Sequence, residues 1–285
     1  MSVELADFKT LALRREGGVL HVTLNRPEVR NAMSMAMVRE LRVVLAQAEM
    51  RCGTHDIKHD TARDTAHDIA RVIVLRGAGG HFCAGADLSD MAAARMQLQD
   101  DPQALVQTNT AFGELCVAYA DTGIATVAVV EGSCMGGGFG LACVTDVTLA
   151  TETASFRLPE TSLGLVPAQI GPFLVERLGY AEAKRLAVTG GKLGAQEALA
   201  LRLVHEVHSA DAIDAALTRV LSGIQQCAPG AVAATKALIA KARFQSPAAL
   251  VQEAAAVFSR AALGPEGIEG TTAFLQKRKA SWVLS

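Results

Sequence analysis

Two glycine-containing segments, each just after an apolar run, carry the residue types best suited to chemistry. They are residues 81–88 (HFCAGADL) and 131–141 (EGSCMGGGFGL). Small residues let a ligand approach the backbone closely, and N–H groups at a helix start point outward with a favourable dipole. Two such donors, one from each segment, could hold a carbonyl oxygen that becomes an oxyanion during a reaction. Either segment alone could equally be a tight turn that allows close helix packing.

Other motifs of enzyme sites are incomplete in this sequence. Residues 77–82 and 136–141 both lack the last glycine of the dinucleotide-binding pattern G-x-G-x-x-G. The run Gly190-Gly191-Lys192 is followed by leucine instead of serine or threonine, and the pattern G-x-S-x-G does not occur. The sequence therefore argues against a dinucleotide site, a P-loop and a serine hydrolase of that type.

A repeat of His or Arg followed by Asp recurs every four residues between positions 55 and 68. On a helix this spacing would line the side chains along one stripe, where histidines four residues apart can bind a metal. Nothing nearby supplies the buried partners that metal ligands use. We therefore interpret residues 55–68 as a solvated surface segment and expect no metal.

The composition excludes several classes of protein. Half of the 285 residues are hydrophobic, 20% are charged and 4% are aromatic, which argues against a disordered chain. A net charge of −2 gives no basic surface for nucleic acid. Charges and glycines interrupt the most apolar stretch, residues 122–149, so no membrane span is expected. The acidic N-terminus does not suit a signal peptide, and the six cysteines form no C-x-x-C pair, so we expect a cytoplasmic protein.

The sequence predicts alternating strands and helices around the two glycine-containing segments, and these elements must position them. Apolar runs at 72–75, 126–130 and 147–150 indicate buried strands, and residues 11–13 and 19–24 indicate a hairpin. A helical period begins at Ser34. Beyond about residue 195 alanine-rich helices dominate, with Pro229 and Pro247 at helix starts and a break at Gly264-Pro265. We predict an α/β core over residues 1–200 and a helical region over 201–285.

Five segments in order resemble the enoyl-coenzyme A hydratase/isomerase (crotonase) superfamily, from near Leu11 to the end of the chain. Residues 19–33 (VLHVTLNRPEVRNAM) resemble its first strand and coenzyme-binding loop. Residues 82–88 (FCAGADL) and 130–147 (VEGSCMGGGFGLACVTDV) resemble its oxyanion-hole segments. Residues 156–167 (FRLPETSLGLVP) resemble its catalytic-glutamate segment, and residues 267–282 resemble its C-terminal tail.

The resemblance implies a spiral core of ββα turns, a C-terminal helical trimerisation region, and a homotrimer or dimer of trimers. It implies an acyl-coenzyme A thioester as substrate and no separate cofactor, because coenzyme A is part of the substrate. Carried over by position, the N–H groups of Ala84 and Gly137 would bind the thioester oxygen, and Glu160 would transfer protons. The positions that would contact the substrate or its coenzyme are Arg30, Ala32, Ala86, Asp87, Leu88, Gly136, Gln169, Phe274 and Lys277.

The sequence departs from the family where the chemistry takes place. Hydratases of this family usually have two glutamates; here Glu160, after Pro159, matches the second position, and Gly140 stands at the first. One proton-transfer group fits a hydratase acting on a 2-enoyl thioester, which we take as the leading prediction. It also fits a Δ3-to-Δ2 enoyl isomerase, and a non-catalytic acyl-coenzyme A-binding paralogue is the remaining alternative.

A second departure follows Pro167, where the family commonly has a glycine-rich stretch and this chain has Ala168 and Gln169. Gln169 could orient water, bind a polar acyl group, or cap the next helix. The combination of Gly140, Glu160 and Gln169 resembles the subgroup that hydrates branched glutaconyl thioesters, such as isohexenylglutaconyl-coenzyme A in acyclic terpene degradation. The resemblance alone leaves the acyl chain length and branching open.

Overall fold

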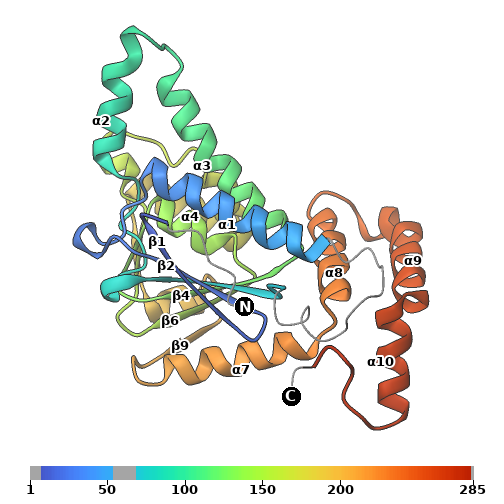
Figure 1. Cartoon of the computed structure of the whole chain (residues 1–285). Helices are drawn as coiled ribbons and strands as arrows, with labels where there is room; N and C mark the ends of the chain where they lie inside the picture. The colour runs from blue at the N-terminus through green and yellow to red at the C-terminus, as the bar shows by residue number, and fades with distance from the viewer. Residues whose placement is uncertain (1–7, 54–68, 284–285) are drawn as a thin grey trace.

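The computed structural model of the chain describes residues 8–53 and 69–283 (Figure 1). The repeat at 55–68 lies outside these residues. Within them, ten α-helices accompany two sheets. The helices are Met35–Gly53 (α1), Leu88–Met96 (α2), Ala104–Asp121 (α3), Gly137–Cys143 (α4), Gly171–Thr189 (α5), Ala195–Ala200 (α6), Ile213–Gln226 (α7), Pro229–Ala242 (α8), Pro247–Leu263 (α9) and Pro265–Leu275 (α10). Short 3-10 helices are Pro27–Val29 (η1), Ala78–Gly80 (η2), Gln97–Gln99 (η3) and Glu160–Leu163 (η4).

The main sheet has the strand order β1-β2-β3-β4-β6-β9 in the described part of the chain. Only the β1–β2 pairing is antiparallel; the later pairings are parallel. Parallel neighbours end at the same edge of a sheet, so the loops after β3 and β4 emerge together. The strands are Leu11–Glu16 (β1), Val19–Leu24 (β2), Val72–Gly77 (β3), Ala125–Val130 (β4), Val147–Thr151 (β6) and Glu206–His208 (β9).

Both faces of this sheet are covered, which explains its continuous apolar strands. On β3, Ile73 and Leu75 face the core under α1 and α3, whereas Val72 and Val74 pack with residues of α7 on the other face. Figure 1 shows α1, α3 and α4 on one side of the sheet and α7 on the other. The sheet is therefore a rigid platform for the loops at its edge.

A second, smaller sheet includes part of the second glycine-containing segment, residues 131–141. Its order is β5-β7-β8, with β5 parallel and β8 antiparallel to β7. Its strands are Ser133–Met135 (β5), Ser155–Arg157 (β7) and Lys192–Gly194 (β8). This sheet connects the segment before α4 to the segment that leads into η4.

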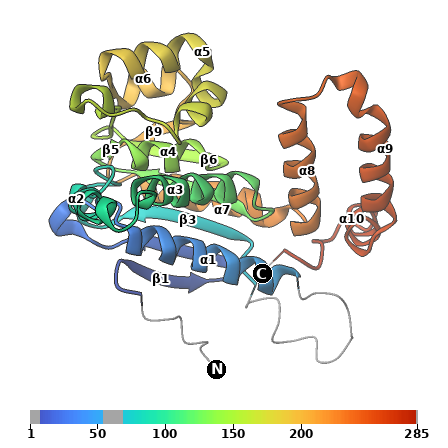
Figure 2. The same ribbon diagram turned by 90° about the horizontal axis from the view of Figure 1, so that it is seen from above.

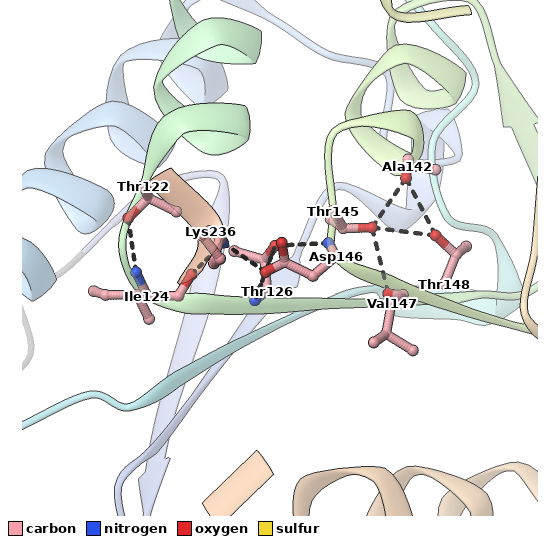
Figure 3. Close-up of polar contacts among 9 residues, drawn as sticks. All are labelled: Thr122, Ile124, Thr126, Ala142, Thr145, Asp146, Val147, Thr148 and Lys236. Atoms are coloured by element: carbon pink, nitrogen blue, oxygen red, sulfur yellow. Dashed lines mark hydrogen bonds and ion pairs between the residues drawn. The ribbon is translucent and has the colours of Figure 1, made fainter. Parts of the chain in front are cut away.

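Helices α8, α9 and α10 stand beside the α/β core, as Figures 1 and 2 show. A polar cluster ties α8 to the core (Figure 3): Lys236 Nζ donates to Ile124 O at 2.7 Å and pairs with Asp146 Oδ2 at 2.6 Å. Asp146 Oδ2 also accepts hydrogen bonds from the N–H and hydroxyl of Thr126 at 2.7 and 3.0 Å. The cluster fixes the start of β4 and the loop before β6 to the helical region.

Most predicted elements are confirmed. The hairpin, the three buried strands and the helix after Ser34 are present, and Pro229 and Pro247 begin α8 and α9. The second sheet and β9 were not predicted, because three-residue strands leave no readable period. The division at residue 200 stays a prediction, and β9 and α7, which follow it, pack on the main sheet.

Candidate active site

The two glycine-containing segments lie side by side. Cys83 N–H donates to Ser133 O at 3.0 Å, and Met135 N–H donates to Cys83 O at 2.9 Å. The two backbones also approach each other at two glycines with positive φ, Gly85 (φ 95°) and Gly136 (φ 47°). A Cβ on Gly136 would lie 3.7 Å from Gly85 Cα, and a Cβ on Gly85 would lie 3.2 Å from Met135 O. Glycine at both positions therefore lets the two backbones approach.

The backbone hydrogen bonds of these segments determine which of their N–H groups remain available to a ligand. Ala84 N–H donates to Arg30 O at 2.9 Å, and Gly136 N–H donates to Arg157 O at 3.0 Å. Within the described residues, the N–H groups of Ala86 and Gly137 have no acceptor. The prediction that Ala84 supplies an oxyanion donor is therefore revised: its N–H is already used, and Ala86 takes its place in the geometry.

A bridge to the loop after β2 explains why Ala86 N–H is free. Met33 N–H donates to Gly85 O at 2.8 Å, and Asp87 N–H donates to Met33 O at 3.0 Å, so Met33 and Ala86 form an isolated parallel bridge. In such a bridge the C=O of residue 85 and the N–H of residue 87 face Met33. The N–H of Ala86 therefore points away from Met33. Ala86 is exposed and Gly137 is half-buried at the start of α4, so both donors are accessible.

Asn31 holds this loop in place, and the sequence interpretation missed it. Its side chain is fully buried, its Oδ1 accepts from Arg26 N–H at 2.9 Å, and its Nδ2 donates to Ala78 O and His81 O at 2.8 and 2.7 Å. Its φ of 57° is a left-handed conformation that asparagine tolerates better than most residues. The signal available in the sequence was an asparagine in a breaker loop, Asn25 to Asn31, where turn chemistry is expected.

The other predicted coenzyme-binding residues of the core surround this loop. Arg30 is exposed and has a φ of 50°, Ala32 is half-buried, and Leu88 is exposed. Asp87 Oδ2 accepts from Arg26 at 2.7 Å, while its Oδ1 accepts from Ser89 N–H and so caps α2. Burial alone would raise the pKa of Asp87, but hydrogen bonds from Ser89 and Arg26 lower it. The Asp87 side chain thus links Arg26 of the loop after β2 to the start of α2.

Glu160 is the carboxylic acid that faces the paired segments. It begins η4 directly after Pro159, and its Oε1 lies 2.8 Å from the position that a Cβ on Gly136 would occupy. Its Oε2 is buried and makes no hydrogen bond with the described residues. Burial raises the pKa of this carboxyl above its ordinary value. A half-buried carboxyl with one unpaired oxygen, beside free N–H groups, is suited to proton transfer.

The space beside Gly140 is filled by Ile170. A Cβ at position 140 would lie 2.1 Å from Ile170 Cγ2 and 3.8 Å from Phe112 Cζ. The same Phe112 ring carbon would lie 3.2 Å from a Cβ on Gly137. Ile170 is 3% exposed, so this side chain cannot simply turn into solvent. The position at which the family usually has its first glutamate is therefore an apolar contact between α3, α4 and the start of α5.

Gln169 contacts α3, and the expectation that it caps the next helix is not met. Its Nε2 donates to Asn109 Oδ1 at 2.8 Å, and a Cβ on Gly113 would lie 2.1 Å from its Oε1. The residue before α5 is Ile170, and no side chain caps the helix there. Gln169 is therefore held against α3, one residue before the isoleucine that fills the space at Gly140.

The predicted tail residues lie far from these loops within one chain. Phe274 is 82% exposed on α10, and Lys277 follows that helix with a φ of 54°. Figures 1 and 2 both place α10 across the molecule from α2. Contact between these residues and a ligand at the paired segments would thus require a neighbouring subunit.

The described residues, 8–53 and 69–283, include neither a metal-binding cluster nor a membrane-spanning helix. No group of three or more His, Cys, Asp or Glu side chains there is arranged to hold a metal ion. Among the helices described, none is both long and apolar enough to cross a membrane. Of the cysteines described, Cys83, Cys116, Cys134 and Cys143 are buried free thiols, and Cys227 is an exposed one.

Comparisons with known proteins agree with this geometry. Two solved structures match with a TM-score of 0.87 over 97% of this chain and 100% of their own: Pseudomonas aeruginosa AtuE, 48% identical, and an enoyl-CoA hydratase/isomerase from Marinobacter aquaeolei, 43% identical. The 2,3-dehydroadipyl-CoA hydratase of Escherichia coli is 30% identical over 94% of this chain and 96% of its own length. A peroxisomal Delta(3,5)-Delta(2,4)-dienoyl-CoA isomerase of Arabidopsis thaliana is 28% identical over 96% and 97%.

The family model described as enoyl-CoA hydratase/isomerase matches residues 14–284, nearly the whole chain. The fold of the solved relatives is the crotonase fold, as predicted from the order of the five segments. The chain therefore belongs to the enoyl-CoA hydratase/isomerase family.

Proposed function

We propose that the protein is an enoyl-CoA hydratase that adds water to a 2-enoyl thioester, with Glu160 as its single acid/base. The observation that carries this proposal is the placement of Glu160 beside Gly136, next to the two free N–H groups of Ala86 and Gly137. A thioester oxygen bound by both donors would receive stabilisation as negative charge develops. Each donor of such a pair contributes about 2.7–4 kcal/mol in other enzymes.

The chemistry requires one proton to move twice. The Glu160 carboxylate removes a proton from water while the water oxygen bonds to the β-carbon, and the carbon–carbon π electrons form an enolate. Glu160 then returns the proton to the α-carbon, which restores the thioester carbonyl. The raised pKa of Glu160 supports this cycle, because a carboxyl with a pKa closer to neutral pH is better matched to both proton transfers.

The acyl group that we propose is a branched glutaconyl type, such as isohexenylglutaconyl. The combination of Gly140, Glu160 and Gln169 supports this choice, and the E. coli hydratase is a relative named for a dehydroadipyl thioester, whose acyl group is dicarboxylic. Coenzyme A belongs to the substrate, and the reaction needs no other cofactor. The proposed place of the protein is the cytoplasm.

A homotrimer or a dimer of trimers is the proposed assembly. Large apolar side chains are exposed in the C-terminal helical region, among them Phe244 in the turn after α8 and Phe258 and Leu263 on α9, each more than 70% exposed in the single chain. Contact between copies would bury them and bring a neighbour's Phe274 and Lys277 toward the coenzyme. Sedimentation equilibrium should give three or six times the 29.8 kDa of one chain; a monomer would contradict this assembly.

A Δ3-to-Δ2 enoyl isomerase is the second candidate, and one observation favours it. Ile170 and Phe112 make the surroundings of Gly140 apolar, at the position where a second carboxylate would otherwise help to hold water. An isomerase needs one group that moves a proton between the α- and γ-carbons and no water. The relative named as a dienoyl-CoA isomerase is consistent with this use of the fold.

Turnover of matched thioesters distinguishes the candidates. Purified protein is incubated in ¹⁸O-labelled water with crotonyl-, 3-methylglutaconyl- and isohexenylglutaconyl-CoA, and separately with a 3-enoyl-CoA. Hydratase activity gives ¹⁸O-labelled 3-hydroxyacyl products, and isomerase activity gives the 2-enoyl thioester without label. Tight binding without either product would identify a non-catalytic paralogue. Glu160→Gln is the control, and an unchanged rate in this variant would refute the role of Glu160.

A further inference from the structure

The amide pair Asn109–Gln169 lies along the same wall as the proposed oxyanion site. Asn109, Phe112 and Gly113 are three and four residues apart on α3 and therefore share one face of that helix. The Phe112 ring on this face contacts the start of α4 at Gly137, and Gln169 packs on Gly113. Asn109 is about one helical turn, roughly 5 Å, beyond Gly113. A chain bound by its carbonyl at Gly137 and running along Phe112 would thus meet the amide pair several carbons from the thioester.

The free edge of this pair is rich in hydrogen-bond donors. Two side-chain amides have four N–H groups, and the 2.8 Å bond from Gln169 Nε2 to Asn109 Oδ1 uses one of them. The Gln169 oxygen is pressed against Gly113, so it is the nitrogens that remain available. Asn109 is exposed and Gln169 is half-buried, which leaves the pair accessible from solvent.

We propose that Asn109 and Gln169 bind an acceptor oxygen carried several carbons along the acyl chain, either a carboxylate or a neutral hydroxyl. The pair is then a specificity determinant of the proposed reaction, and this inference rests on the proposed function. A purely aliphatic chain would leave the donors without a partner on binding, and an unpaired buried donor lowers affinity. The pair therefore favours acyl chains with a second oxygen-bearing group.

Three five-carbon thioesters of matched length test the inference: glutaconyl-CoA, 5-hydroxypent-2-enoyl-CoA and pent-2-enoyl-CoA. The wild-type enzyme should have a higher kcat/KM for one of the first two than for pent-2-enoyl-CoA. Gln169→Leu should lower kcat/KM for the preferred thioester by about tenfold or more, as expected for a lost hydrogen bond to a polar group. Its kcat/KM for pent-2-enoyl-CoA should stay within about twofold of the wild-type value. Gln107→Leu, the same change at an exposed position of α3, is the matched control.

Gln169→Glu separates the two oxygen sources without removing the link to α3. Asn109, which accepts from Gln169 in the wild type, can turn its amide over and donate its Nδ2–H to the new carboxylate, so the loop stays attached, but a substrate carboxylate would meet a like charge. If the pair binds a substrate carboxylate, Gln169→Glu should lower kcat/KM for glutaconyl-CoA alone. If it binds a hydroxyl, this variant should keep its kcat/KM for 5-hydroxypent-2-enoyl-CoA.

The inference is overturned if Gln169→Leu lowers kcat/KM for all three thioesters alike, which would mean that the pair only supports the loop, or if it changes none of them. Loss of the proposed function is a separate result: wild-type protein would then turn over none of the three, or Glu160→Gln would turn them over as fast as wild type does.

Discussion

Gly140 and Ile170 form a matched pair whose substitution tests the packing beside the proposed site. In Gly140→Ala the new Cβ would lie 2.1 Å from Ile170 Cγ2 and 3.0 Å from Ile170 Cβ. Carbon atoms normally approach only to about 3.5–4.0 Å. Rotation of the isoleucine moves Cγ2 but not Cβ, so the backbone of α4 or of residue 170 must shift. We expect Gly140→Ala to lower the free energy of unfolding by about 1–3 kcal/mol.

A double-mutant cycle assigns that loss to the contact. Ile170→Ala alone removes a buried side chain and should cost about 2–5 kcal/mol. It removes the carbon at 2.1 Å but keeps a Cβ at position 170, 3.0 Å from the methyl group introduced by Gly140→Ala, so the clash is relieved in part and the combined loss should fall short of additivity by about 0.5–2 kcal/mol. Urea unfolding at one fixed protein concentration measures the two single variants and the double variant. Gly171→Ala is the control, because a Cβ there meets no atom within 4 Å.

The same pair determines what a glutamate at position 140 can do. Gly140→Glu alone should not raise crotonyl-CoA hydration, because Ile170 occupies the space that its first side-chain atoms need. Gly140→Glu combined with Ile170→Ala should raise it. Strictly additive stability losses, or a Gly140→Ala variant as stable as the wild type, would mean that Ile170 does not fill this space.

Two further predictions concern Glu160 and Asn31. Because burial raises the pKa of Glu160, kcat/KM should fall in acid through a pKa above that of an ordinary glutamate, and Glu160→Gln should abolish this limb of the pH profile. A carboxyl whose pKa is raised by folding contributes stability below its unfolded pKa and loses that contribution as pH rises through its folded pKa; Glu160→Gln should therefore raise the urea midpoint at neutral pH but not in acid. Asn31→Ala leaves the Arg26 N–H and the Ala78 and His81 carbonyls unpaired, and should cost about 3 kcal/mol or more in urea unfolding. Asn31→Asp, which keeps the acceptor for Arg26, should be less destabilised, and equal stability of Asn31→Ala and wild type would contradict this role.

Local signals in the sequence were sufficient for the elements around the site. Apolar runs that end in glycine marked β3 and β4, and short motifs that resemble the family led to the prediction of Glu160 and Gly137 as site residues. Prolines at 229 and 247 marked helix starts because proline suits the first helical turn. These features depend on residues close together in the chain, which is why a single sequence contains them.

What could not be predicted depends on partners distant in sequence. Whether Ala84 or Ala86 offers a free N–H depends on the bonds from Ala84 to Arg30 and from Asp87 to Met33, more than fifty residues away. Gln169 is sixty residues from Asn109, and Ile170 is thirty residues from the glycine whose space it fills. No periodicity or propensity reports such contacts, since they are fixed only when the elements pack.

Deuterium incorporation at the α-carbon, when a 2-enoyl-CoA substrate is turned over in D₂O, tests directly whether Glu160 moves the proton. Wild-type protein should transfer deuterium to that carbon through Glu160. Glu160→Gln keeps the size of the side chain and leaves the backbone N–H donors of Ala86 and Gly137 in place. It should slow the transfer by about 10²–10⁴-fold. Transfer by Glu160→Gln at a rate within a few-fold of the wild type would contradict the assignment of Glu160 as the acid/base.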